Sequence, residues 1–78
     1  MKYTVSVSEY KSGQGHIRTS PEESGVCSEA FTAEEWFKSH DFYEIQDDEW
    51  LEIEVSFYND EDNPLFDDPI SASEFTAK

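Results

Sequence analysis

The stretch EWLEIEVSFY, residues 49–58, decides the fold of this chain. Its aliphatic and phenyl side chains fall on alternate positions, and acids, aromatic residues and a serine occupy the positions between them. Because successive side chains of a strand point to opposite faces, this alternation predicts a β-strand with one buried and one exposed face. The predicted buried face consists of Leu51, Ile53, Val55 and Phe57, and the predicted exposed face consists of Trp50, Glu52, Glu54, Ser56 and Tyr58.

The residues before this strand predict a partner strand and a helix. Residues 42–46 (FYEIQ) are predicted to form a hairpin with residues 49–58 around a turn at 47–48. Further upstream, Thr32-Ala33-Glu34-Glu35 fits a capping box, in which the threonine hydroxyl and the glutamate carboxylate each satisfy a free backbone N–H group. The sequence therefore predicts a helix of about two turns over residues 32–39, which needs tertiary packing to be stable.

The residues after the strand predict irregular structure. Residues 59–69 are rich in Asp, Asn and Pro, which predicts a loop. Leu65 and Phe66 within this loop are expected to fold back onto the core. Residues 71–74 (SASE) are expected to cap a short last turn, within a C-terminal segment 59–78 that frays.

The N-terminal third predicts a first hairpin. Residues 2–10 (KYTVSVSEY) alternate, with Tyr3, Val5 and Val7 on one face. Residues 11–15 supply a turn with two glycines, and residues 16–19 predict the returning strand. Residues 20–25 (SPEESG) are predicted to be a loop, followed by a strand fragment at 26–27.

These elements predict a single α+β domain over residues 1–78. Its expected architecture is an antiparallel sheet of three or four strands with one short helix packed on the apolar face. A chain of 78 residues buries only about 60–65% of its unfolded surface, which argues against a deep enclosed active site. Six Phe, four Tyr and two Trp argue for a folded core rather than for a disordered acidic chain.

Several classes of protein are excluded by composition. Cys27 is alone, so no disulfide scaffold is expected within the chain. Residues 1–3 lead into alternating residues rather than an apolar segment, and no apolar run approaches the about 20 residues of a membrane span. The net charge of −14 opposes direct contact with nucleic acid or an anionic membrane. A cytoplasmic protein with a basic partner is expected.

Catalytic and metal-binding patterns are weak. Cys27 with His16 or His40 would make a thiolate pair only if the fold brought them together. Residues 59–71 contain a calcium-like acidic run but lack the glycine and the final glutamate of an EF-hand loop. Residues 13–15 (GQG) lack the third glycine of a nucleotide-binding loop. We therefore expect no enzymatic activity, no metal site and no cofactor.

The acidic residues are the strongest functional signal. Residues 41–68 carry twelve carboxylates, and no Lys or Arg occurs between Lys38 and Lys78. Glu52 and Glu54 are predicted to point the same way at about 6.6–6.8 Å spacing, which is comparable with the step between successive phosphates of a nucleic-acid strand. Trp50 is consistent with either core packing or an interface. The predicted partner-binding residues are Asp47, Asp48, Glu49, Glu52, Glu54, Tyr58, Asp60, Glu61, Asp62, Asp67 and Asp68.

The chain resembles the small acidic inhibitors of bacterial defence that phages and plasmids encode, including anti-CRISPR and antirestriction proteins. The resemblance lies in size, charge, aromatic content and the clusters Asp47-Asp48-Glu49 and Asp60-Glu61-Asp62. Some of those inhibitors are DNA mimics. The resemblance therefore implies a non-enzymatic inhibitor that occupies the basic nucleic-acid groove of a bacterial defence nuclease or CRISPR effector.

Other functions remain open from the sequence. An acidic binding module of the antitoxin or adaptor type would hold a basic partner without mimicking nucleic acid. A solvated housekeeping domain would carry the same charge as an adaptation to a salty environment. In both alternatives, nucleic acid is not expected to compete with this protein for its partner. Such competition is expected for an inhibitor of a nucleic-acid-binding protein.

Overall fold

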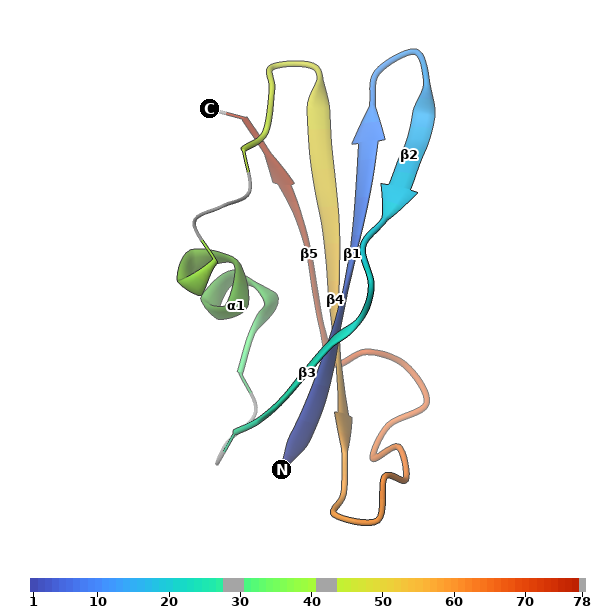
Figure 1. Ribbon diagram of the computed structural model, residues 1–78, viewed down its shortest axis with the longest axis vertical. Helices are drawn as coiled ribbons and strands as arrows, with labels where there is room; N and C mark the ends of the chain where they lie inside the picture. Colours follow the sequence, from blue (N-terminus) through green and yellow to red (C-terminus); the bar gives the residue numbers. More distant parts are fainter. Residues whose placement is uncertain (28–30, 41–43, 78) are drawn as a thin grey trace.

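The computed structural model describes residues 1–27, 31–40 and 44–77. These residues form a five-stranded antiparallel sheet and one short helix, an α+β arrangement with more strands than the three or four predicted (Figure 1). The elements are β1 (Lys2–Lys11), β2 (Gly15–Thr19), β3 (Glu23–Val26), α1 (Ala33–Ser39), β4 (Glu49–Tyr58) and β5 (Ser71–Thr76).

β1 and β4 form the centre of the sheet. They pair along their full length, from Lys2 opposite Tyr58 to Lys11 opposite Glu49. β5 pairs with the other edge of β4, so both edges of β4 are occupied by distant segments. The predicted hairpin between residues 42–46 and 49–58 is therefore wrong over 44–46, which are not in a strand, while residues 42–43 lie outside the described residues.

The free edge of β1 is shared by β2 and β3. β2 pairs with the second half of β1, after a turn in which Gly13 and Gly15 adopt positive φ angles of 84° and 73°. β3 pairs with the first half, so the predicted loop over 20–25 extends only to residue 22. Gly25 of β3 is opposite Tyr3 of β1. A residue with a side chain would not fit at this position, because a Cβ there would lie 2.5 Å from the Tyr3 ring.

The C-terminal segment differs most from its prediction. Residues 71–74 belong to β5 rather than to a capped turn, and Leu65 and Phe66 are 44% and 51% exposed rather than folded onto the core. The loop is held instead by its backbone, with Leu65 N–H donating to the Phe57 carbonyl at 3.0 Å. The small and polar residues of SASEFT give little hydrophobic signal, but pairing with β4 provides backbone partners that a frayed end would lack.

The helix packs on one face of the sheet, beside β5 and β4 (Figure 1). Thr32 caps its first turn as predicted, because its Oγ1 accepts a hydrogen bond from Glu35 N–H at 3.2 Å. Ser71 of β5 adds a second cap by accepting from Ala33 N–H at 2.7 Å. The helix thereby closes a core that includes both predicted apolar faces. The buried residues are Val5, Val7, Ala33, Trp36, Leu51, Ile53, Val55 and Phe57.

Candidate protein-binding face

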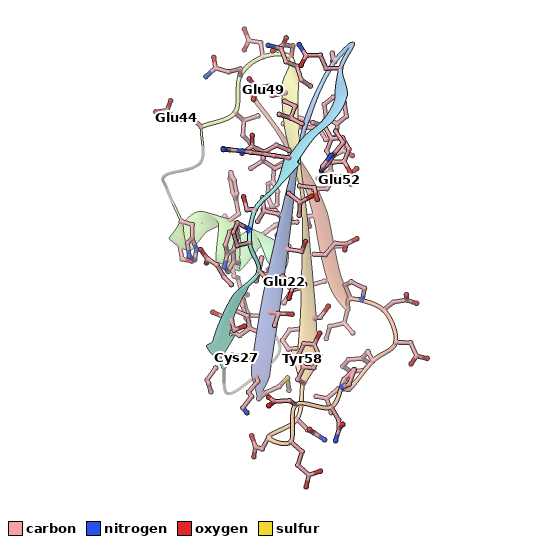
Figure 2. The ribbon with its side chains drawn as sticks, turned by 45° about the vertical axis from the view of Figure 1, so that its right-hand side comes forward. Glu22, Cys27, Glu44, Glu49, Glu52 and Tyr58 are labelled. Carbon is pink, nitrogen blue, oxygen red and sulfur yellow. The ribbon has the colours of Figure 1, made fainter. Side chains whose placement is uncertain are left out.

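The second face of the sheet lies opposite the helix and carries most of the predicted interface residues of β4. We name it the open face. It consists of Lys2, Thr4, Ser6, Ser8 and Tyr10 of β1, Trp50, Glu52, Glu54, Ser56 and Tyr58 of β4, and Ala72, Glu74 and Thr76 of β5, which alternate with the core-facing positions. Figure 2 shows Glu49, Glu52 and Tyr58 succeeding one another along β4.

Three carboxylates gather at the centre of the open face. Glu52 and Glu54 are both exposed, as predicted from the alternation of β4. Glu74 of β5, which is not among the partner-binding residues that the sequence predicts, is directly opposite Glu52. Directly opposed side chains on adjacent antiparallel strands have Cβ atoms about 4.5–5.5 Å apart, so the two like charges repel each other. Only the pairing register of β5 reveals this neighbour, because SASEFT carries no acidic run.

A shallow hollow of about 240 Å³ lies among these carboxylates. Glu52, Glu54, Ala72 and Glu74 line it together with parts of Ile53 and Ser73. Ala72 is opposite Glu54 across the strand pair, and its short side chain leaves the space unfilled. The open face therefore combines negative charge with a concave surface.

An aromatic pair stands next to the carboxylates. Tyr10 and Trp50 are opposite each other, and their rings stack with centroids 5.4 Å apart and planes inclined by 7°. His16 of β2 meets the other side of Tyr10 edge-on at 5.3 Å. Trp50 is half-buried on the open face and is not among the buried core residues, so its position is compatible with an interface.

The Tyr10 phenol reports the electrostatics of this face. Desolvation, a hydrogen bond with Glu52 and the charges of Glu52 and Glu54 together raise the pKa of Tyr10 above its ordinary value of 10.0. Each of these effects favours the neutral phenol over the phenolate. The carboxylates therefore create a negative field that extends across the strand pair to β1.

The remaining predicted residues lie at the two ends of β4. Asp47, Asp48 and Glu49 are at its start, where Lys11 Nζ is 3.7 Å from an Asp48 carboxylate oxygen. The acidic loop, residues 59–69, begins at the other end of β4. A strand of ten residues separates its two ends by about 33 Å. The predicted set is thus a row along the molecule with Glu52 and Glu54 in its middle, rather than one compact cluster.

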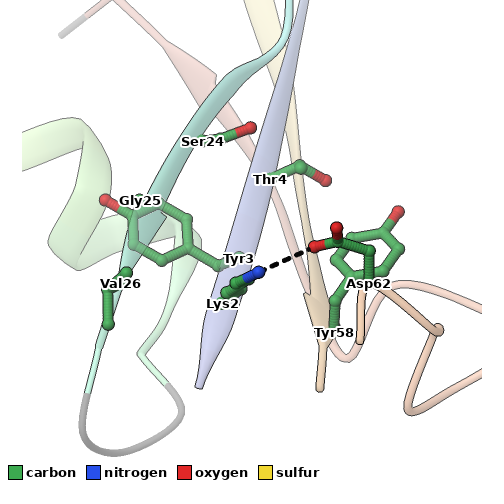
Figure 3. Close-up of a pocket in the computed structure, with 8 residues that line it drawn as sticks. All are labelled: Lys2, Tyr3, Thr4, Ser24, Gly25, Val26, Tyr58 and Asp62. Atoms are coloured by element: carbon green, nitrogen blue, oxygen red, sulfur yellow. Dashed lines mark hydrogen bonds and ion pairs between the residues drawn. The ribbon is translucent and has the colours of Figure 1, made fainter. Parts of the chain in front are cut away.

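The acidic loop is ordered by its own hydrogen bonds. The Asn59 side-chain oxygen accepts from the backbone N–H groups of Glu61 and Asn63, both at 3.0 Å. Asp62 adopts a positive φ of 63°. Its carboxylate oxygen Oδ1 forms an ion pair with Lys2 Nζ at 3.0 Å. Beside this pair, a hollow of about 360 Å³ is lined by residues that include Tyr58 and Val26 (Figure 3). Asp67 and Asp68 are exposed further along the loop.

The ion pairs identified among the described residues lie around the open face rather than at its centre. Lys2 and Lys11 pair with acids at the two ends of β4, and Arg18 pairs with Glu9 at 2.8 Å. His40 at the end of α1 is 3.2 Å from a Glu23 oxygen of β3. None of these pairs involves Glu52, Glu54 or Glu74, so the middle of the open face keeps its negative charge.

Cys27 and His16, which the sequence offers as a candidate thiolate pair, lie near opposite ends of β1. Cys27 lies beside Met1, because its backbone N–H donates a hydrogen bond to the Met1 carbonyl at 2.8 Å. His16 pairs with Tyr10 near the other end of β1. His40 bonds instead to Ser39, to the Trp36 carbonyl and to Glu23. Within residues 1–27, 31–40 and 44–77, no group of three or more His, Cys, Asp and Glu side chains is arranged to hold a metal ion.

Comparison with protein-family models, with curated proteins and with solved structures finds no match to this chain. No helix in the described part of the chain is long and apolar enough to cross a membrane.

Proposed function

We propose that this protein is a non-enzymatic acidic inhibitor that docks its open face into the basic nucleic-acid groove of another protein. The target is a bacterial defence nuclease or CRISPR effector, and the two proteins bind each other in the bacterial cytoplasm. The observation that carries the proposal is the centre of the open face, where Glu52, Glu54 and Glu74 stand next to a stacked aromatic pair. Among residues 1–27, 31–40 and 44–77, none of the identified ion pairs involves these three carboxylates.

The physical basis is replacement of phosphates by carboxylates. Lys and Arg side chains of a nucleic-acid groove form charge-assisted hydrogen bonds with phosphate oxygens, and carboxylates accept the same bonds. Glu52 and Glu54 repeat at about 6.6–6.8 Å along β4, which approximates the phosphate step of one strand. Tyr10 and Trp50 add the type of aromatic surface that is enriched in protein interfaces.

A basic partner that does not bind nucleic acid is the second candidate. The position of Glu74 favours it, because a second glutamate whose Cβ lies about 5 Å from that of Glu52 across the strand pair has no counterpart in a single row of phosphates. In this case the protein is an acidic binding module of the antitoxin or adaptor type. The charge complementarity is the same, but the partner surface is not a nucleic-acid groove.

Competition with DNA distinguishes the two candidates. Tagged protein is incubated with bacterial lysate, with and without added DNA, and the captured proteins are quantified. The inhibitor proposal predicts that DNA displaces the captured partner and that the partner itself binds DNA. Capture that is insensitive to DNA, at unchanged ionic strength, would support the second candidate instead.

Charge reversal then tests the surface. The Asp47→Lys, Asp48→Lys, Glu52→Lys and Glu54→Lys quadruple variant should lose the partner, because Lys and Arg of the groove would meet positive charge. Its circular dichroism spectrum and unfolding transition establish whether the fold is intact. Retention of the partner by the folded variant would show that binding uses another surface.

A further inference from the structure

His40 lies at the end of α1 and connects the helix to β3. It follows the last helical residue, and its backbone N–H donates a hydrogen bond to the Phe37 carbonyl at 3.1 Å. Its ring nitrogen Nε2 is 3.2 Å from a carboxylate oxygen of Glu23. Glu23 is opposite the core residue Val5, so it belongs to the core-facing side of β3. Because β3 pairs with β1, whereas the helix packs beside β4 and β5, this contact joins the helix to the other side of the sheet.

Both ring nitrogens of His40 face oxygen atoms that can only accept hydrogen bonds. Nδ1 is 2.8 Å from the Trp36 carbonyl oxygen, and Nε2 faces the Glu23 carboxylate. Nδ1 is also 2.9 Å from the Ser39 hydroxyl, but that hydroxyl donates its single hydrogen to the same Trp36 carbonyl at 2.8 Å. A carbonyl and an ionised carboxylate have no hydrogen to donate, so each ring nitrogen must supply one.

Only the protonated, cationic ring satisfies both contacts. A neutral imidazole carries one N–H group, so either tautomer turns a nitrogen lone pair toward the Trp36 carbonyl or toward the Glu23 carboxylate. The ring also stacks on the Trp36 indole, with centroids 4.2 Å apart and planes inclined by 21°, and an aromatic face attracts a cation. In addition, the carbonyl end of a helix favours positive charge, and His40 is at that end of α1.

We propose that His40 is a pH-sensitive clasp, which holds the end of α1 against β3 while its ring is protonated. Among the described residues, the charged group that faces the ring is Glu23 of β3, and Trp36 and Ser39 of α1 contribute uncharged acceptors. Because the cation is the form that has partners, its contribution to stability is present at low pH and is lost as rising pH removes the proton. The clasp lies on the helix side of the sheet, so it goes beyond the proposed function of the open face.

A double-mutant cycle between His40 and Glu23 tests the clasp. The unmodified protein, His40→Gln, Glu23→Gln and the double variant are unfolded with urea at about pH 5.5 and about pH 8.5, where histidine side chains are ordinarily protonated and neutral. The coupling should change the folding equilibrium constant by about two- to fivefold at the lower pH and should vanish at the higher pH. The effect of pH on the other charges is common to all four proteins and cancels. Equal coupling at both pH values, or none at either, would overturn the clasp.

His16, the second histidine of the chain, provides the matched control. Its Nε2 is 2.8 Å from the Thr19 hydroxyl, which can either donate or accept, so a neutral ring keeps this contact. A cycle between His16→Gln and Glu23→Gln should therefore show no coupling at either pH. Coupling as large as that of His40 would mean that the cycle measures net charge, and it would overturn the clasp.

Nuclear magnetic resonance on the unmodified protein provides a readout that does not depend on a variant folding. Long-range correlations between ring protons and ring nitrogens follow the titration of His40. The amide signals of Glu23 and Ser24 in β3 should move together with this titration, because the Glu23 carboxylate loses its charged partner when the ring loses its proton. The same movement should persist in His16→Gln. Amide signals of β3 that do not follow the His40 ring would overturn the clasp.

Discussion

The two faces of β4 come from the same ten residues and have opposite properties. Its odd-numbered residues from Leu51 to Phe57 are at most 4% exposed and make contact with β1 and the helix. Its even-numbered residues carry two exposed glutamates and a half-buried tryptophan. One face therefore supplies folding energy, whereas the other contributes charge repulsion that opposes folding.

This difference is the reason that we propose the acidic surface as a binding surface. Buried apolar side chains each stabilise the fold by about 1.5–3 kcal/mol, which offsets the cost of placing Glu52 opposite Glu74. A charge arrangement that lowers stability is expected where the charges act on a partner. The buried face makes the open face possible because it holds β1, β4 and β5 in register.

The largest expected effect comes from opening a cavity in the buried face. Ile53 is 0% exposed, so Ile53→Ala should lower the free energy of unfolding by about 2–5 kcal/mol. Urea denaturation followed by circular dichroism measures the change. Glu54→Ala, one residue further along and on the open face, is the control and should change the free energy by less than about 0.5 kcal/mol. Similar losses in both variants would contradict the division of β4 into two faces.

A smaller loss of stability is expected at the contact between Tyr3 of β1 and Gly25 of β3. Gly25→Ala places a Cβ 2.5 Å from the Tyr3 ring and should cost about 1–3 kcal/mol of unfolding free energy, because the ring must move. The same substitution in a Tyr3→Ala background should cost less, since the ring is then absent. Equal costs in the two backgrounds would mean that the Tyr3 ring does not occupy this space.

The open face predicts an effect of opposite sign. Glu74→Gln removes the like charge opposite Glu52, so it should raise the free energy of unfolding by about 0.2–1 kcal/mol at low salt. The gain should shrink as salt is added, because the repulsion is screened. Glu22→Gln removes one charge from an exposed loop and should give a smaller gain. A loss of stability in Glu74→Gln would show that Glu74 contributes a favourable contact.

The smallest expected effect is a change in titration. The raised pKa of Tyr10 means that the fold favours the neutral phenol, so this contribution to stability is present below pH 10.0 and is lost as pH rises through the raised pKa. Glu52→Gln should lower the pKa of Tyr10 toward its ordinary value. Ultraviolet absorbance titration, with a Tyr10→Phe variant to assign the signal, measures the shift. An unchanged titration in Glu52→Gln would mean that Glu52 does not act on Tyr10.

The sequence predicts those parts of the fold that depend on local patterns. Alternation identifies both faces of β4 and the buried Val5 and Val7 of β1, and the capping box identifies the start of the helix at Thr32. The glycines of residues 13–15 mark the first turn correctly. These features are determined by neighbours in sequence, which is why they are visible without a structure.

Features that depend on distant pairing are not visible in the same way. β4 pairs with β1 and β5, whereas the described part of its predicted partner, residues 44–46, is not in a strand. β5 has too few apolar residues to be recognised. For the same reason the sequence does not single out Glu74, although this residue is directly opposite Glu52. The composition indicates an acidic surface, but only the register of the strands reveals which carboxylates share its centre.

The most direct test of the central claim compares two triple variants of equal charge. Glu52→Gln, Glu54→Gln and Glu74→Gln neutralise the centre of the open face, and Glu22→Gln, Glu34→Gln and Glu44→Gln neutralise three exposed acids elsewhere. The measurement is the affinity of each variant for the partner that DNA displaces. Our account predicts a loss of at least about tenfold for the open-face variant and little change for the control. Equal losses in the two variants would contradict it, because net charge rather than the open face would then determine binding.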